Sequence, residues 1–182
     1  MRRRAPNRLE ALGRLTVRPK PGAPTRGIMT AGALAIPVAL GRAGIRANKR
    51  EGDGATPRGR FRLVRLWWRG DRLPRPRTAL PLRAIRRDDG WCEDPRDRNY
   101  NRPVRVPEGS SADRLARADR LYDLVIELDH NTRPRVAGRG SAVFIHVARP
   151  GFAPTAGCVA LTLPALRRLV GRLGPGTVIE ID

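Results

Sequence analysis

The segment SAVFIHV, residues 141–147, and the segment TAGCVAL, residues 155–161, decide the fold of the chain around them. The first is a short, nearly continuous apolar run after a glycine-rich turn, which is typical of a buried β-strand. His146 lies at the end of that strand. The loop over residues 148–156 then brings Cys158 back beside it, so a rigid strand and a small glycine turn are expected to meet.

Short apolar or alternating runs on either side of this pair predict further strands, and Gly and Pro are spread between them. Two stretches predict short helices: one capped by Ser110 or Ser111, and one starting at Thr162 with Pro164 in its first turn. The fold class is therefore mainly β with one or two short helices, a sandwich or barrel in a single domain. The strands are expected near residues 15–17, 33–40, 61–67, 122–129, 141–147 and 177–181, and the helices over 110–120 and 162–173.

The chain has 182 residues, enough for one compact domain with its own core. Residues 1–12 are basic and predict a disordered arm, and residues 13–182 predict the domain. Residues 28–40 are uncharged, which fits either two buried strands or the apolar part of a signal peptide. Gly32, Pro37 and the distance from the N-terminus favour strands. No apolar run reaches the ~20 residues that a membrane-spanning helix needs.

The net charge of +20 comes almost entirely from arginine, since Lys20 and Lys49 are the only lysines. Such a charge fits a polyanion partner, or a coding bias that places arginine wherever a cation is tolerated. The arginines are dispersed and no aromatic ladder accompanies them. No nucleic-acid partner is therefore expected.

The two segments contain one of the two cysteines and one of the two histidines of the chain. A thiol is an effective nucleophile as thiolate, and a neighbouring imidazole is a common way to form one. We interpret Cys158 as the nucleophile and His146 as the general base and acid. A buried structural thiol, a structural histidine and a Cys92–Cys158 disulfide remain alternatives. No zinc-ligand spacing is present, so neither a metal nor another cofactor is predicted.

The remaining chemistry of this region is assigned to backbone groups. The N–H groups of Gly157 and Cys158 are candidate oxyanion donors, and the Val147 carbonyl is a candidate partner for the His146 ring. His130 is expected to have a structural role. Residues 49–61 are glycine-rich but lack the lysine–serine or lysine–threonine end of a phosphate-binding loop.

Residues 54–61 (GATPRGRF), His146 at a strand end and the Thr155-x-Gly157-Cys158 motif together resemble the YkuD-type L,D-transpeptidase catalytic domain. The resemblance covers about residues 13–182. It implies attack of Cys158 on the bond after the third residue of a peptidoglycan tetrapeptide stem, a thioester, and transfer to an amine to form a 3→3 cross-link. Peptidoglycan stem peptides are the implied partners, and the periplasm or cell envelope is the implied location, although the chain shows no clear signal peptide.

The motif differs from the usual family pattern at Ala156, where the family often has histidine, and at Ala160, where it often has arginine or asparagine. Thr155 and Arg149 are therefore assigned to substrate binding, with Arg50 as a second candidate for the stem carboxylates. Two other functions remain open. One is a hydrolase with the same Cys/His pair and water as acceptor, and the other is a basic polyanion-binding module. The sequence makes no prediction of oligomeric state or of a role for Cys92.

Overall fold

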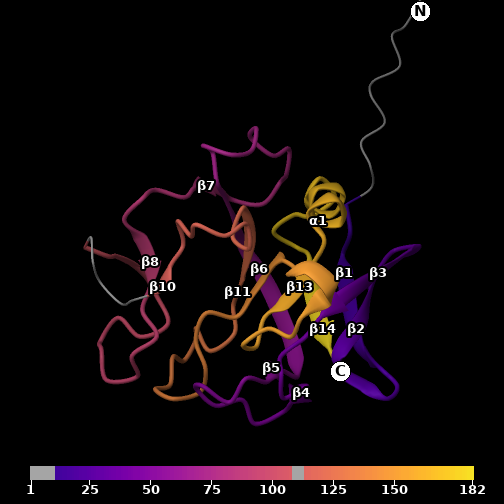
Figure 1. Cartoon of the computed structure of the whole chain (residues 1–182), viewed down its shortest axis with the longest axis horizontal. Helices are drawn as coiled ribbons and strands as arrows, with labels where there is room; N and C mark the ends of the chain where they lie inside the picture. Colours follow the sequence, from indigo (N-terminus) through magenta and orange to yellow (C-terminus); the bar gives the residue numbers. More distant parts are fainter. Residues whose placement is uncertain (1–10, 108–112) are drawn as a thin grey trace, which may run out of the picture.

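The structure is a computed structural model that describes residues 11–107 and 113–182 (Figure 1). It is mainly β, as predicted, with one α-helix and one 3₁₀ turn among the described residues. The strands are β1 (Arg14–Lys20), β2 (Ala23–Ala31), β3 (Leu34–Ala39), β4 (Ile45–Arg46), β5 (Thr56–Pro57), β6 (Gly59–Trp68), β7 (Leu82–Ala84), β8 (Asp89–Trp91), β9 (Pro103–Arg105), β10 (Asp113–Arg114), β11 (Leu124–Leu128), β12 (Phe144–Val147), β13 (Val159–Leu161) and β14 (Val178–Ile181). The 3₁₀ turn η1 covers Pro150–Phe152 and the helix α1 covers Leu163–Val170.

The largest sheet closes on itself into a barrel. Its strand order is β11-β12-β13-β3-β2-β1-β14-β6-β7, and an additional pairing joins β11 to β6. The long strand β6 makes this closure, since it pairs with β14 near Gly59 and with β11 from Leu63 to Trp68. β12 and β13 run parallel, with His146 opposite Ala160. The two predicted segments are therefore neighbouring strands of one barrel wall.

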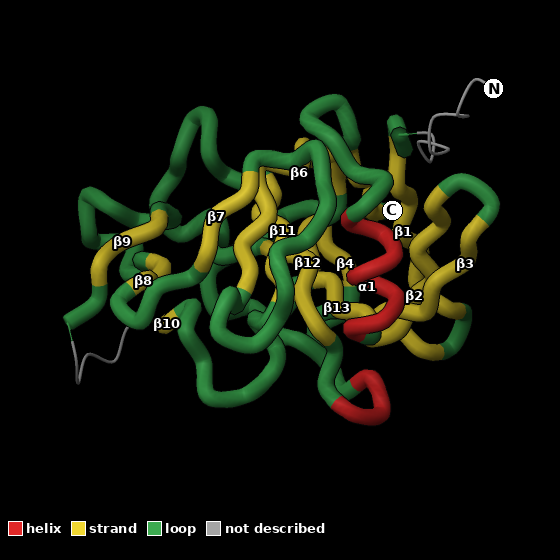
Figure 2. The backbone as a smooth tube through the Cα atoms, turned by 90° about the horizontal axis from the view of Figure 1, so that it is seen from above, coloured by secondary structure: helices red, strands yellow, loops and turns green. Residues whose placement is uncertain are grey.

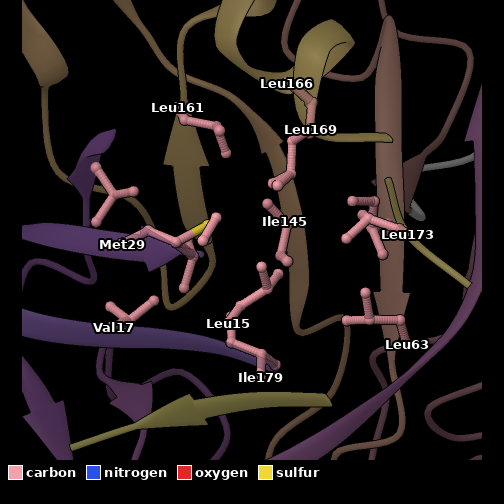
Figure 3. Close-up of a cluster of buried hydrophobic side chains, with 14 of the residues drawn as sticks. Leu15, Val17, Met29, Leu63, Ile145, Leu161, Leu166, Leu169, Leu173 and Ile179 are labelled. Atoms are coloured by element: carbon pink, nitrogen blue, oxygen red, sulfur yellow. The ribbon is translucent and has the colours of Figure 1, made fainter. Parts of the chain in front are cut away.

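Side chains alternate between the two faces of each strand, and the aliphatic side chains on the inner face fill the barrel. Ile145 on β12 points into the core, as do Leu15 on β1 and Ile179 on β14 (Figure 3). The helix α1 contributes Leu166 and Leu169 to the same core, and Leu173 follows from the turn after it. Because side chains alternate between the two faces of a strand, Phe144 and His146 point to the outside of the barrel.

A second apolar cluster covers part of that outer face. It joins Trp67 and Phe144 from the barrel wall to Trp91 and Leu115, which come from the segment between β7 and β11. That segment forms the three-stranded sheet β10-β8-β9 at one end of the molecule, away from α1 and β1–β3 (Figures 1 and 2). Cys158 belongs to this outer cluster. The candidate nucleophile is thus held between the barrel wall and its cover.

Several predicted elements are confirmed with shorter bounds. The uncharged stretch 28–40 contributes to two paired strands, β2 and β3. α1 begins at the predicted position, directly after Thr162, but it ends at Val170 and does not reach Leu173. The Thr162 hydroxyl caps the helix by accepting from Ala165 N. Gly171 and the turn that follows it replace the expected last helical turn.

The predicted helix over residues 110–120 is wrong in its described part. Asp113 and Arg114 form β10, because their backbone groups pair with β8, and Leu115 N donates to Asp89 O. The proposed caps Ser110 and Ser111 lie outside the described residues, as do residues 1–10 of the expected arm. Leu12 is buried in the core. Of the helices in the described chain, none is long and apolar enough to cross a membrane.

Candidate active site

His146 and Cys158 lie on the same outer face of the barrel wall. His146 is opposite Ala160 in the parallel β12–β13 pair, and Cys158 is two residues before Ala160. Since residues two apart in an extended strand share a face, the two side chains are diagonal neighbours on adjacent strands. Both are buried, with 6% and 8% of their surfaces exposed. The structure therefore brings together the pair that the sequence predicted.

Two backbone groups hold the Cys158 thiol. It donates to Ala142 O at 3.2 Å, and its sulfur accepts from Phe144 N at 3.4 Å. Ala142 has a φ of +49°, a left-handed conformation that is uncommon for a residue with a side chain. Its amide donates to the Asn101 side chain at 3.1 Å, which fixes this conformation. Ala142 and Asn101 thus position the carbonyl that the thiol contacts.

The ring of His146 is oriented by the backbone carbonyl of the next residue in its strand. Its Nδ1 lies 2.8 Å from Val147 O, which is the backbone partner that the sequence predicted. An N–H at Nδ1 leaves Nε2 as the nitrogen that can accept a proton. The ring also packs edge-on against Tyr122, with 5.4 Å between ring centroids. No hydrogen bond joins His146 to Cys158 in the described structure, because the thiol turns toward Ala142.

Burial keeps both groups neutral. Loss of solvation raises the pKa of the Cys158 thiol to about 12, although the Phe144 amide opposes that shift. Loss of solvation also lowers the pKa of His146 to about 4, with the Val147 carbonyl acting in the opposite direction. At neutral pH the resting pair is therefore a thiol and a neutral imidazole, not a thiolate–imidazolium ion pair.

The Thr155 hydroxyl organises the turn that carries Cys158. It donates to Cys158 O at 2.7 Å and accepts from Gly157 N at 3.1 Å. The Gly157 amide, predicted as an oxyanion donor, is thus occupied by Thr155 in this conformation. Thr155 lines the cavity beside His146, but its hydrogen bonds are those of a residue that shapes the turn.

Gly157 is required by both its conformation and its surroundings. Its φ is +145°, and a Cβ atom there would lie 2.8 Å from Ala55 O. Ala55 belongs to the glycine-rich segment 54–61. The hydroxyl of the next residue, Thr56, accepts from Gly41 N at 2.8 Å and donates to Cys158 O at 3.5 Å. The segment singled out in the sequence therefore supports the back of the cysteine turn.

Two cavities meet at Cys158. The first, which we call the histidine cavity, has a volume of ≈ 130 Å³ and is lined by His146, Arg149 and Thr155 among others. The second, the carboxylate cavity, has a volume of ≈ 280 Å³ and is lined by Glu51, Glu93 and Asp113 among others. Four residues line both cavities: Arg117, Tyr122, Ala156 and Cys158.

Of the cationic side chains predicted to bind substrate, Arg149 lines the histidine cavity and is exposed. Arg50 is exposed and lines neither cavity. His130 contacts Arg139 O at 3.0 Å, in keeping with a structural role. Cys92 is a free, buried thiol, so the Cys92–Cys158 disulfide is absent.

Sequence reasoning missed Tyr122, Arg117 and Ala142. Tyr122 precedes β11, which pairs with β12 through Val125 and His146. That pairing places Tyr122 beside the histidine, and a search for aromatic residues at the ends of the neighbouring strand would have found it. Ala142 has no such signal, because its role depends on its carbonyl group and on a positive φ.

Comparison with known protein families gives one match. The sequence model of the YkuD family, described as the L,D-transpeptidase catalytic domain, matches residues 28–181. No curated protein and no solved structure matches the chain significantly. The matched range includes both candidate catalytic residues and all the barrel strands except β1 and the first part of β2.

Proposed function

The chain belongs to the YkuD family of L,D-transpeptidase catalytic domains, and from this membership we propose that it is a cysteine acyltransferase that cross-links peptidoglycan stem peptides. Members of this family act on peptidoglycan and are usually associated with the cell envelope. We assign this chain to the periplasm or cell envelope as part of the same proposal. The observation that carries the assignment is the pairing of Cys158 with His146 on adjacent strands at a shared cavity.

In the first half-reaction, Cys158 attacks the carbonyl carbon of the third residue of a tetrapeptide stem. The thiol proton passes to His146 Nε2, which is the free nitrogen because Nδ1 faces Val147 O. The new C–S bond makes a tetrahedral intermediate, and the C–N bond to the fourth residue then breaks. His146 returns the proton to the departing amine, leaving a thioester on Cys158.

This step requires the thiol to turn from Ala142 O toward His146. The rotation exchanges one hydrogen bond at sulfur for another, so its cost is small compared with that of creating a bare thiolate in a buried site. Transfer of the proton as the C–S bond forms avoids that thiolate. The raised pKa of Cys158 and the lowered pKa of His146 favour this concerted route over a preformed ion pair.

The developing oxyanion needs donors near the cysteine turn. We assign this role to the Cys158 N–H, and to the Gly157 N–H once substrate displaces its contact with the Thr155 hydroxyl. Arg149 is assigned to a carboxylate of the donor stem, because it is exposed on the histidine cavity and its guanidinium makes no hydrogen bond or ion pair within the described residues.

The test is the intact mass of the protein after incubation with tetrapeptide muropeptides and, separately, with a carbapenem. The wild-type protein is expected to gain one acyl group, and Cys158→Ala none. Cys92→Ala is the matched control, since it removes the other buried free thiol, and it should still be acylated. An adduct on Cys158→Ala, or none on the wild type with its thiols reduced, would refute the proposal.

A further inference from the structure

A large cavity lies beside the outer apolar cluster and apart from the two cavities that meet at Cys158. It has a volume of ≈ 850 Å³, and none of its lining residues lines either of the other two. Trp91 of the outer cluster contributes to its wall. Its charged residues are five arginines and two carboxylates, which together have a formal charge of +3: Arg62, Arg65, Arg102, Arg133, Arg135, Glu127 and Asp129. We call it the arginine cavity.

The two carboxylates of the arginine cavity neutralise little of this charge. Glu127 is 6% exposed. It accepts from Trp67 Nε1 at 3.0 Å and pairs with Arg65 Nε at 3.0 Å. Asp129 accepts from the backbone N–H of Arg62 at 2.7 Å and forms no ion pair within the described residues. Of the five arginines, only Arg65 therefore has a carboxylate partner in the described part of the chain.

The four other guanidiniums have no carboxylate partner within residues 11–107 and 113–182. Arg62, Arg102 and Arg133 are exposed, and their guanidiniums make no hydrogen bond there either. Arg135 donates to Asn101 O at 3.3 Å. Loss of solvation and, as a second cause, repulsion by Arg102 lower the pKa of Arg135, so these two cations lie close enough to repel each other. An anion that contacts both would relieve this repulsion.

Two neighbouring guanidiniums without a counter-ion match a phosphate monoester better than a carboxylate. A phosphate monoester has close to two negative charges at neutral pH and three strong acceptor oxygens, whereas a carboxylate has one charge and two oxygens. Guanidinium groups bind such oxygens with pairs of parallel N–H donors. One phosphate can therefore accept from Arg102 and Arg135 together, with Arg62 and Arg133 in the same lining.

The rest of the lining indicates which kind of molecule carries the phosphate. Asp129 accepts from Arg62 N through Oδ1, and its Oδ2 has no hydrogen-bond partner within the described residues, so it can accept from a ligand hydroxyl. Of the described residues that line the cavity, only Trp91 is aromatic. Trp91 is 3% exposed and packs edge-on against Phe144, so it offers no open ring face to a nucleotide base. A hydroxyl-rich body, as in a sugar or polyol, matches this lining.

We propose that the arginine cavity binds a phosphorylated sugar or polyol, with its phosphate held by Arg102 and Arg135 and a hydroxyl held by Asp129. The volume of the cavity lies within the range of small-ligand sites. The site is separate from Cys158 and goes beyond the proposed acyl transfer, because it adds a ligand and not a step of that reaction. A free sugar phosphate and a phosphorylated unit of a glycan present the same groups to it.

The first test is isothermal titration calorimetry of the full-length protein with glucose 6-phosphate, inorganic phosphate, glucuronate and AMP. We expect glucose 6-phosphate to bind most tightly, about tenfold more tightly than glucuronate, as for one additional charge-assisted hydrogen bond. Tighter binding of glucuronate would overturn the phosphate assignment, and tighter binding of AMP would overturn the sugar assignment. A phosphorylated oligosaccharide that binds more tightly than glucose 6-phosphate would identify a glycan as the source, and one that binds more weakly a free sugar phosphate.

Two substitutions separate the phosphate contact from the hydroxyl contact. Arg102→Gln should weaken the binding of glucose 6-phosphate and of inorganic phosphate, each by about tenfold. Asp129→Asn keeps Oδ1 for Arg62 N but replaces Oδ2 by an amide. It should remove the preference for glucose 6-phosphate without weakening the binding of inorganic phosphate. Unchanged binding in Arg102→Gln, or an equal loss of both probes in Asp129→Asn, would overturn the proposed contacts.

Arg75→Gln is the matched control for the loss of one positive charge. Arg75 is exposed, lies outside the cavity, and has no hydrogen bond or ion pair from its guanidinium within the described residues. The variant should bind both probes like the wild type, and a loss equal to that of Arg102→Gln would indicate general charge attraction and overturn the site. Cys158→Ala should also bind glucose 6-phosphate like the wild type. A protein that binds this probe but is never acylated would therefore refute the proposed function and support the arginine cavity as a separate site.

Discussion

The Cys158 thiol donates to Ala142 O at 3.2 Å and makes no hydrogen bond to the neighbouring His146 ring within the described residues. Ala142 reaches this position through a left-handed backbone conformation that Asn101 holds from behind. The arrangement keeps the thiol protonated and turned from its proposed base until substrate arrives. A buried thiolate has few compensating charges here, so a resting thiol is the expected state.

The first prediction concerns the reactivity of this thiol. Because burial raises the pKa of Cys158 to about 12, alkylation by iodoacetamide should be slow at pH 7 and should accelerate as the pH rises above 9. The rate is measured by intact mass in a Cys92→Ala background, since Cys92 is the other thiol of the chain. Fast alkylation that levels off below pH 8 would indicate a thiolate–imidazolium pair and contradict this structure.

The second prediction concerns stability in acid. The pKa of His146 is lowered from 6.5 to about 4, so the unfolded chain binds its proton more tightly than the folded protein does. The stabilising contribution of this histidine is complete above pH 6.5 and is lost as the pH falls toward 4, by up to about 3 kcal/mol. Urea unfolding at a series of pH values should show this loss in the wild type.

His146→Gln is the comparison for that experiment, because it keeps a polar side chain without a titrating ring. Its free energy of unfolding should decline less between pH 6.5 and 4 than that of the wild type. Parallel curves for the two proteins would mean that the histidine is not the group that titrates.

The third prediction distinguishes the effect of the two Thr155 hydrogen bonds from the effect of the shape of its side chain. Thr155→Val removes the hydroxyl partner of Gly157 N and the shorter of the two hydroxyl contacts of Cys158 O, which should cost about 1–3 kcal/mol of stability and slow acylation. Thr155→Ser keeps the hydroxyl and should retain most of the stability and most of the acylation rate. Thermal unfolding and carbapenem acylation rates measure the two effects. If Thr155→Ser were as impaired as Thr155→Val, the methyl group and not the hydroxyl would matter.

The fourth prediction concerns the glycine before the cysteine. Gly157→Ala combines a positive φ with a contact of 2.8 Å to Ala55 O, so we expect a loss of at least about 2 kcal/mol and little remaining acylation. Gly138→Ala is the control, because Gly138 has a φ of +75° but open space around its Cβ position. It should cost only about 1 kcal/mol, measured by chemical denaturation, and leave acylation unchanged. Equal losses would show that the Ala55 contact is unimportant.

The parts of this fold that the sequence predicted are those with a local signal. Apolar runs marked the β12 strand, and the Thr162 cap with Pro164 marked the start of α1. The helix expected through residue 120 failed because Asp113 pairs with Trp91, far away in the sequence. A local capping pattern carries no information about such a partner.

The residues of the candidate site also divide into those with a local sequence signal and those without one. Cys158, His146 and the Val147 carbonyl were found because they lie within or beside the two quoted segments. The carboxylate cavity was not, since Glu51, Glu93 and Asp113 come from three separate loops and strands. Their convergence depends on how the segment between β7 and β11 covers the barrel, which no short motif encodes.

The last prediction tests the cation on the histidine cavity. Arg149 is exposed, and its guanidinium has no hydrogen bond or ion pair within the described residues. Arg149→Ala should therefore leave the melting temperature nearly unchanged and raise the KM for a donor stem with a free carboxylate, by about tenfold for one charge-assisted contact. A donor whose carboxylates are amidated should show no difference between the two proteins. Arg168→Ala, on the exposed side of α1, is the control for the loss of one positive charge. Equal KM changes in the two variants would indicate a general charge effect and would remove Arg149 from donor recognition.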